Sequence, residues 1–386
     1  MAAPLAHRSS GEVFLEALQR RVYASVGQTA EDHQRREWLG RLAVLPVRLQ
    51  QKAAELAPDE FTRYCQAVAA ALARDEAAPR PTAFERPHQY AILRELKDRI
   101  EQAAERLALP VPVSPVLGTL PTRLLEPLML PVPASDEVVI VVDGGLLTYA
   151  HTLAGALALA VPFELVEPEA FVPARPQAGW EQRIDPTGEA SRQFIDLVLA
   201  VAASGPAGAP AGHVDATTEP LAAALCDAME TFLIGREYGR LVHGDQLAAP
   251  VERRWVHGQP CDAFRWTQSQ ELEADVVGLA LVVSAAIDRG ESARLAWWGV
   301  DTLLASFDLL ERVVRCFSRA QFVPLSALGP TVFEARRQAL AQAMLHWDPA
   351  RRAIAFSDAL APVVGTLIDR FEIVLQDLLA GHGLVQ

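Results

Sequence analysis

Apolar residues recur at steps of three and four along most of the chain, which is the spacing of one face of an α-helix. The first region, residues 1–110, opens with such a helix after a candidate cap at Ser10. Its apolar face carries Phe14, Leu15, Leu18 and Val22. The last hundred residues keep the same pattern, so we expect a C-terminal helical extension over residues 346–386.

Two kinds of segment interrupt the helical pattern. Val138–Val142 is a continuous β-branched run that ends at Asp143-Gly144-Gly145, which predicts a buried strand, a turn and a following helix. The Pro-rich stretches Pro110–Asp136 and 165–190 favour extended chain, with room for short strands in the first, and the segment between Trp255 and Trp266 looks irregular. We therefore expect an α+β fold that is predominantly α-helical and contains a small β-sheet.

The helix predicted over Leu221–Val242 carries two arginines on its apolar face. That face is formed by residues at steps of three and four, namely Leu225, Met229, Phe232, Arg236, Arg240 and His243. Its first half is apolar and should pack inward, so Arg236 and Arg240 should lie on the interior side. A buried arginine is costly unless it is paired, and we therefore expect anionic side chains opposite them.

The next predicted helix, from about Ser269 to Ile287, supplies two carboxylates at a suitable spacing. Glu271 and Asp275 are four residues apart and therefore share one face. Glycines that would let the two helices approach closely are Gly235, Gly239 and Gly278. The pattern predicts a helix pair joined by an internal Arg/Glu/Asp network.

The segment Arg236–Arg240, Arg-Glu-Tyr-Gly-Arg, resembles the HExxH signature of zinc metallopeptidases with arginine in place of both histidines. In that signature the histidines bind zinc, and the glutamate, here Glu237, is the general base that activates the metal-bound water. Residues 271–275 resemble the ExxxD motif of gluzincin peptidases. The resemblance implies that Glu271 stands where the third zinc ligand would be, and that Asp275 stands where a carboxylate supports a ligand histidine.

Two further segments carry the resemblance. The strand and turn that begin at Val138 resemble the edge strand and turn that precede the HExxH helix in CAAX-prenyl-protease-like and heat-shock-protease-like families. A later segment resembles their HPxxxxR motif, with Pro330 kept, Gly329 in place of the histidine, and Arg336 one residue late. The resemblance implies a zincin-like core over residues 111–345, extended by N- and C-terminal helices.

Arginine changes the chemistry of such a site. A guanidinium stays protonated in proteins and offers no lone pair to a metal, so Arg236 and Arg240 predict a site with no metal and no cofactor. They bring positive charge comparable with that of zinc, opposite Glu237, Glu271 and Asp275. Our hypothesis is that they replace the metal as an internal ion-pair network, whose loss would cost roughly 3–5 kcal/mol.

A displaced metal site stays open as an alternative. His243 lies one turn beyond Arg240 and could join Glu271, although two ligands are too few and a solvent-facing or capping histidine is the simpler interpretation. His257 precedes Cys261 in the sequence and could complete a site. Glu237 could still act as a base without a metal, but the sequence supplies no nucleophile motif, P-loop or glycine-rich dinucleotide loop.

Composition narrows the classes of function. The chain has 386 residues, of which 51% are apolar, and a net charge of −13, so a sizeable core is available and binding to nucleic acid or an anionic membrane is disfavoured. Four well-separated cysteines without CxxC spacing favour reduced thiols in a cytoplasmic protein. The N-terminus lacks the apolar region of a secretory signal. Leu146–Phe163 and Val276–Ile287 favour core helices over membrane spans.

These observations favour an inactive peptidase homologue that works by binding a protein or peptide: a scaffold, a regulator, or an accessory or immunity-type protein of a bacterium. A peptide could bind to such a fold by strand addition. One alternative is an active hydrolase with a relocated metal, and another is a helical interaction module with no peptidase ancestry. The sequence leaves the partner and the oligomeric state open.

Overall fold

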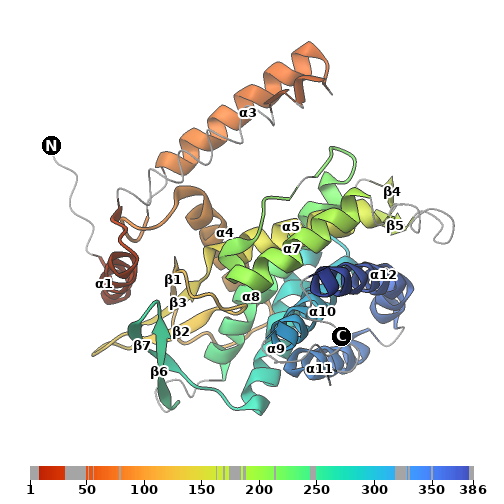
Figure 1. Ribbon diagram of the computed structural model, residues 1–386. Helices are drawn as coiled ribbons and strands as arrows, with labels where there is room; N and C mark the ends of the chain where they lie inside the picture. The colour runs from red at the N-terminus through yellow and green to blue at the C-terminus, as the bar shows by residue number, and fades with distance from the viewer. Residues whose placement is uncertain are drawn as a thin grey trace.

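Helices make up most of the computed structural model, and short strands form three small sheets among the described residues (Figure 1). The structure describes residues 8–30, 49–50, 52–54, 56–77, 80–161, 163–167, 170–173, 184–185, 188–212, 214–243, 249–317, 328, 331–348 and 351–381. The predominantly helical α+β fold expected from the sequence is therefore confirmed.

The helices follow the sequence pattern closely. They are α1 (Ser10–Ser25), α3 (Pro58–Ala77), α4 (Pro87–Arg106), α5 (Gly144–Ala160), α7 (Glu189–Ser204), the short 3₁₀ helix η1 (Pro206–Gly208), α8 (Glu219–Val242), α9 (Gln268–Asp288), α10 (Ala293–Phe317), α11 (Val332–Trp347) and α12 (Arg352–Gly381). In α1 the cap is Ser9, one residue earlier than expected, because Ser9 and Glu12 form a reciprocal capping box. Helix α3 contacts α4 and extends away from the rest of the molecule (Figure 1).

The main sheet has the order β1-β3-β2, with β1 (Val116–Thr119), β2 (Leu128–Pro131) and β3 (Val138–Val142). Strand β3 runs parallel to β1 and antiparallel to β2. The resemblance implied that the strand at Val138 is an edge strand, and this is wrong, because β3 is hydrogen-bonded on both sides. Its continuous β-branched sequence fits that central position.

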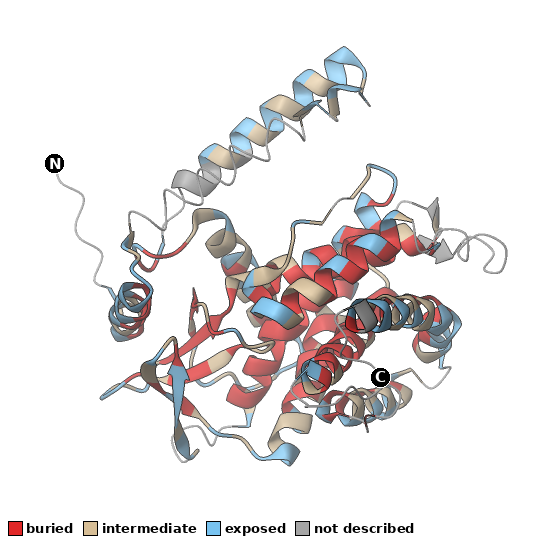
Figure 2. Ribbon diagram, viewed as in Figure 1, coloured by how far each residue is buried: buried red, intermediate tan, exposed pale blue. Residues whose placement is uncertain are grey.

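Both faces of β3 are covered, which explains why every residue of the strand is buried (Figure 2). Ile140 and Val142 enter the large core formed with the helices, whereas Val139 and Val141 enter a second, smaller core. Leu15, Leu18 and Val22 of α1 line that second core together with residues of a hairpin that spans Val251–Phe264. The alternation of side chains along a strand divides the run between the two cores.

Two short strand pairs were not expected from the sequence. The segment between Trp255 and Trp266, expected to be irregular, forms most of a hairpin of β6 (Val251–Val256) and β7 (Gln259–Phe264). Its loop is His257-Gly258, and both residues have positive φ, as a two-residue type I′ turn requires. The Pro-rich stretch 165–190 contributes to the pair β4 (Phe163–Glu167) and β5 (Ala170–Pro173).

Helix α8 is the centre of the helical layer and packs against α9, α5, α10 and α4. Every residue from Ala228 to Leu241 is buried, so the helix is enclosed on all sides and not on one face only. The large core draws residues from all three ranges proposed from the sequence, for example Leu93, Phe232 and Leu367. Trp297 and Trp298 lie in this core.

The structure also bears on the cysteines and on the two apolar runs considered as membrane spans. None of the four cysteines is in a disulfide. Across the described part of the chain, no helix combines the length and the apolar character needed to cross a bilayer.

Candidate functional site

The site predicted from the sequence lies where α8 crosses α9, and glycines set the distance between the two helices. A Cβ atom on Gly239 would lie 2.4 Å from the carbonyl oxygen of Ala274, and one on Gly278 would lie 2.9 Å from the backbone nitrogen of Arg236. Both distances are shorter than side chains tolerate. The two helix backbones are therefore in direct contact, and the arginines of α8 lie beside the carboxylates of α9.

Glu271 joins the two arginines. Its Oε2 atom accepts a hydrogen bond from Nη2 of Arg240 at 2.5 Å and another from Nη2 of Arg236. The expected pairing of Arg236 and Arg240 with this glutamate is present. The guanidinium groups of Arg236 and Arg240 therefore meet at a single oxygen atom of Glu271.

Asp275 is fully buried and has two arginine partners. Its Oδ1 lies 3.1 Å from Nε of Arg236. It also accepts two hydrogen bonds from Arg336 of α11, at 2.5 Å from Nε and 2.8 Å from Nη2. This fork-to-fork pairing is the geometry that arginine and carboxylate groups favour. Arg336, noted in the sequence only as a displaced motif residue, is thus part of the site.

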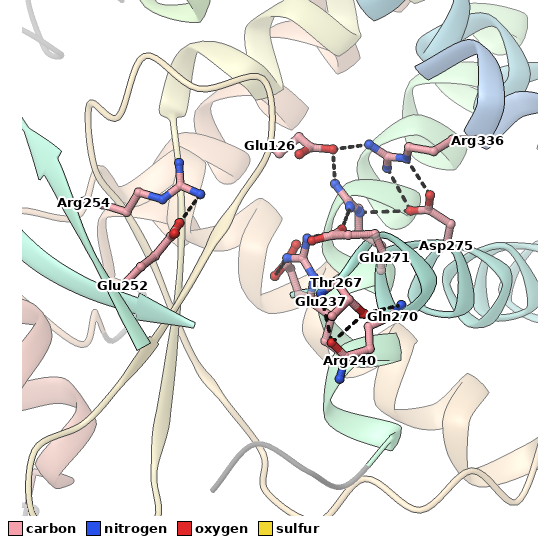
Figure 3. A network of polar contacts seen from close by, with 11 residues as sticks. Glu126, Glu237, Arg240, Glu252, Arg254, Thr267, Gln270, Glu271, Asp275 and Arg336 are labelled. Carbon is pink, nitrogen blue, oxygen red and sulfur yellow. Dashed lines mark hydrogen bonds and ion pairs between the residues drawn. The ribbon is translucent and has the colours of Figure 1, made fainter. Parts of the chain in front are cut away.

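Glu126 is the member of the network that sequence analysis missed. It lies just before β2 and accepts hydrogen bonds from Arg236 and Arg336 (Figure 3). Glu126 comes from the Pro-rich stretch that has no hydrophobic period, so nothing in the sequence pattern placed it near α8. With Glu126 and Arg336 included, three arginines face four carboxylates, where two and three were expected.

The charges of the network shift the pKa values of its members in opposite directions. Burial alone would raise the pKa of Glu126, but the guanidinium groups of Arg236 and Arg336 outweigh it and hold that pKa well below its usual range. Burial would lower the pKa of Arg236, but Glu126, Asp275 and Glu271 together raise it. Both groups are therefore held in their charged forms.

Glu237, which the resemblance likens to a general base, has the fewest partners of the four carboxylates in the network. It is 0% exposed, and its Oε2 atom accepts a hydrogen bond from Nη1 of Arg240. Its Oε1 atom has no hydrogen-bond partner among the described residues. Burial raises the pKa of Glu237 despite the nearby Arg240 and Arg236. A protonated Glu237 would bring three arginines and three charged carboxylates into balance.

Water reaches the network mainly at two of its carboxylates. Arg236, Arg240 and Asp275 are at most 6% exposed, whereas the Glu126 and Glu271 side chains are 33% and 26% exposed. Trp266 covers Arg240, with its ring centre 5.8 Å from the guanidinium carbon. Arg236 and Arg240 therefore lie on the inner side of the network, and Glu126 and Glu271 form its outer side.

The structure separates the residues proposed for a displaced metal site. The imidazole of His243 is partly exposed and lies 3.7 Å from the Glu273 carboxylate, and no hydrogen bond or ion pair joins it to Glu271. Cys261 is buried in the second core, while His257 occupies the hairpin turn. Within the described residues, no group of three or more His, Cys, Asp and Glu side chains is arranged to hold a metal ion. Gly329 and Pro330 lie outside the described residues.

Comparisons with known proteins add no relative: no family model, no curated protein and no solved structure matches the chain.

Proposed function

We propose that the protein is a catalytically inert relative of the gluzincin metallopeptidases that acts by binding another protein or a peptide. The observation that carries the proposal is the convergence of Arg236, Arg240 and Glu271 on one oxygen atom. In a gluzincin site, the side chains at these three motif positions converge on one zinc ion. Here the same three positions are close enough to meet, and guanidinium groups occupy the space of the metal.

The position of Asp275 also supports this ancestry. In the zinc form, this aspartate orients a ligand histidine, and here it lies 3.1 Å from Arg236 at the first of the two histidine positions. Arg336 on α11 contacts the same aspartate. The proposed ancestry accounts for this order of contacts along α8 and α9.

The chemistry of the network argues against catalysis. Guanidinium groups cannot bind a metal or polarise a water as zinc does, and Glu237 is bound to Arg240 and enclosed in protein. Strand addition of a peptide at the main sheet is opposed by burial, because Met129 and Leu130 of β2 are at most 2% exposed. A protein or peptide partner would therefore bind at a surface other than the edge of the main sheet.

Restoring the histidines tests the proposed ancestry. The double variant Arg236→His/Arg240→His should bind one Co²⁺ per chain. The bound Co²⁺ should show the visible d–d absorption of a four- or five-coordinate site, and added Zn²⁺ should displace it. The same variant with Glu271→Gln should bind Co²⁺ at least about tenfold more weakly, because it lacks the third ligand. Wild-type protein should bind neither metal in stoichiometric amount.

Two outcomes would contradict the proposal. Wild-type protein that purifies with one zinc, lost on Glu271→Gln, would indicate an active metal site. A double variant that keeps the wild-type circular dichroism spectrum but takes up no Co²⁺ would show that the three positions do not have the geometry of a zinc site.

A further inference from the structure

Strand β6 (Val251–Val256) has one edge that pairs with no other strand of the described chain. It is hydrogen-bonded to β7 on one side only, and β7 in turn contacts β2. Figure 2 shows β6 in the colour of exposed residues along most of its length, and Val256 is its one buried residue. An unpaired strand edge presents N–H and C=O groups that can pair with another chain.

The hairpin register shows which backbone groups of β6 are directed at β7. The two-residue turn joins Val256 directly to Gln259, and the closing pair of such a hairpin is hydrogen-bonded. At the other end of the hairpin, the carbonyl oxygen of Pro250 accepts a hydrogen bond from the N–H of Arg265 at 2.8 Å. Hydrogen-bonded pairs alternate along an antiparallel ladder. Residues 250, 252, 254 and 256 therefore direct their backbone groups at β7.

The residues between them, Val251, Arg253 and Trp255, direct their N–H and C=O groups at the free edge. Pro260, which has no N–H, lies opposite Trp255 and fits a pair that is not hydrogen-bonded. Among the described residues, these three take no part in the backbone hydrogen bonds found outside helices and strands. The free edge of β6 therefore presents three N–H and three C=O groups in register.

The sequence of β6, Val-Glu-Arg-Arg-Trp-Val, complements itself when two copies run antiparallel. Residues that face the free edge must lie opposite one another, so a symmetric pair of strands can be centred on Arg253. Glu252 then lies opposite Arg254 of the second copy, and Val251 lies opposite its Trp255. Opposite charges and aromatic–β-branched pairs both stabilise antiparallel strands. Because the pairing has two-fold symmetry, each of these contacts occurs twice.

The side chains that would form these contacts are accessible. Trp255 is 67% exposed and Val251 is 50% exposed, although both are apolar. Arg254 and Glu252 form an ion pair within the strand, with side chains that are 51% and 30% exposed. In the symmetric pairing, the two ion pairs would join into a ring of four alternating charges. A second copy of β6 would therefore cover an exposed tryptophan and extend an ion pair that already exists.

Arg253 would lie opposite its own copy at the two-fold axis, which is the unfavourable contact of this arrangement. Its charge is offset within the chain, because its Nε atom lies 3.4 Å from Oδ1 of Asp262 on β7. Across the four strands, each arginine would therefore have an aspartate beside it. The Arg253 side chain is 65% exposed, so the two guanidinium groups can turn away from each other into water.

We infer that β6 pairs with β6 of a second copy of this chain, antiparallel and centred on Arg253, and so forms a four-stranded sheet across a symmetric dimer. The inference rests on the hairpin and not on the α8–α9 crossing, so it does not depend on the proposed peptidase ancestry. A single pair of six-residue strands is a smaller interface than a permanent dimer has, so the dimer should dissociate on dilution.

Sedimentation velocity over about a hundredfold range of protein concentration measures this equilibrium, and wild-type protein should change from monomer to dimer. Arg254→Glu should raise the dissociation constant at least about tenfold, because it places like charges opposite each other twice. The double variant Glu252→Arg/Arg254→Glu restores the opposite charges and should return to within about threefold of wild type. Arg294→Glu, an exposed residue of α10, makes the same change of net charge and should stay within about twofold.

Cysteine cross-linking tests the register of the two strands. Facing Cα atoms of a hydrogen-bonded antiparallel pair are about 5.5 Å apart, which a disulfide can span. Arg253→Cys should therefore form a covalent dimer on mild oxidation. Val251→Cys should not, because its two copies would be offset by four residues, or about 14 Å along the strands. Wild-type protein gives the background from the native cysteines, of which Cys65 is the one that is not buried.

Wild-type protein that stays monomeric over the whole range of concentration would overturn the inference. So would a dimer whose dissociation constant is the same with Arg254→Glu as without it. A dimer in which Val251→Cys cross-links as readily as Arg253→Cys would also contradict the pairing proposed. If Arg254→Glu alters the circular dichroism spectrum, the comparison of the two cysteine variants decides, because neither of them reverses a charge.

Discussion

Arg336 and Arg337 are neighbours in the sequence but lie in different electrostatic surroundings. Arg336 is 4% exposed and pairs with Asp275 and Glu126, whereas Arg337 is 29% exposed and pairs with Asp301 and Glu334. Removing one partner of a buried pair leaves an uncompensated charge and costs roughly 3–5 kcal/mol. Arg337 is only partly buried, so water weakens its ion pairs, and they contribute closer to the value of about 1 kcal/mol found for exposed pairs.

We therefore expect Arg336→Met to lower the free energy of unfolding by roughly 3–5 kcal/mol, and Arg337→Met by clearly less, on the order of 1 kcal/mol. Urea denaturation followed by circular dichroism measures both. The two variants carry the same change of charge and volume at adjacent positions of α11. Equal losses in both would show that the network is not the source of the difference.

The sequence predicted those members of the network that lie on periodic helices. Arg236, Arg240, Glu271 and Asp275 follow from the stripe on α8 and the i, i+4 spacing on α9. Glu126 could not be predicted in this way, because it lies in a Pro-rich segment whose position depends on the sheet. Long-range pairs of this kind depend on tertiary packing and leave no local pattern.

At the scale of elements, the crossing of α8 and α9 depends on residues without side chains. In a helix interior, alanine is favoured over glycine by about 1 kcal/mol. At Gly239 the added methyl group would lie 2.4 Å from the Ala274 carbonyl oxygen and 2.8 Å from its Cα, and neither backbone atom can move without shifting α9. At Gly365 of α12 nothing lies within 4 Å of the added atom.

The two substitutions should therefore have opposite signs. Gly239→Ala is expected to destabilise the protein by about 1–3 kcal/mol through overpacking, and Gly365→Ala to stabilise it by about 0.5–1 kcal/mol through helix propensity. Thermal and urea unfolding of both variants provide the measurement. A stabilised Gly239→Ala protein would mean that α8 and α9 are further apart than described.

The sequence predicted some helices and strands accurately and missed others. The helices α8 and α9 and the strand β3 were located within one or two residues, because their patterns are local. The β6–β7 hairpin was missed, although His257-Gly258 is a two-residue turn between alternating positions. The inward residues are Val256, Cys261 and Ala263, and the single buried residue on β6 gave too weak a pattern. The central position of β3 also escaped, because strand order is a property of the whole sheet.

At the scale of the whole molecule, the protein buries carboxyl groups in two different ways. In the network, arginines hold Glu126 charged. At two other sites burial dominates. It raises the pKa of Glu85 to about 7, although Thr119 and Gln19 donate hydrogen bonds to this carboxylate. It raises the pKa of Glu230 to about 8. An acidic chain with a net charge of −13 therefore carries some carboxyl groups that prefer to be neutral near physiological pH.

The sign of the pH dependence follows from these shifts. A carboxyl group whose pKa is higher in the folded state than in the unfolded chain releases its proton when the protein unfolds. A rise in pH favours this release, so the free energy of unfolding falls as pH rises. For Glu230 the stabilising contribution is fully present below about pH 4.5 and is lost as pH rises through about 8. Glu85 acts in the same direction up to about pH 7. Glu126 acts in the opposite direction, but at low pH, because its pKa is lowered.

Glu230→Gln replaces the carboxyl group with an amide of the same shape that does not titrate. Since each pKa unit corresponds to about 1.4 kcal/mol, we expect the variant to be more stable than wild type by on the order of 1–3 kcal/mol at pH 8.5, and nearly equal at pH 4.5. Urea denaturation at both pH values measures the difference, with Glu273→Gln, whose side chain is 54% exposed, as the control. A gain at pH 8.5 that is equally large at pH 4.5, or that the control shares, would assign it to packing or to net charge instead of the buried carboxyl group.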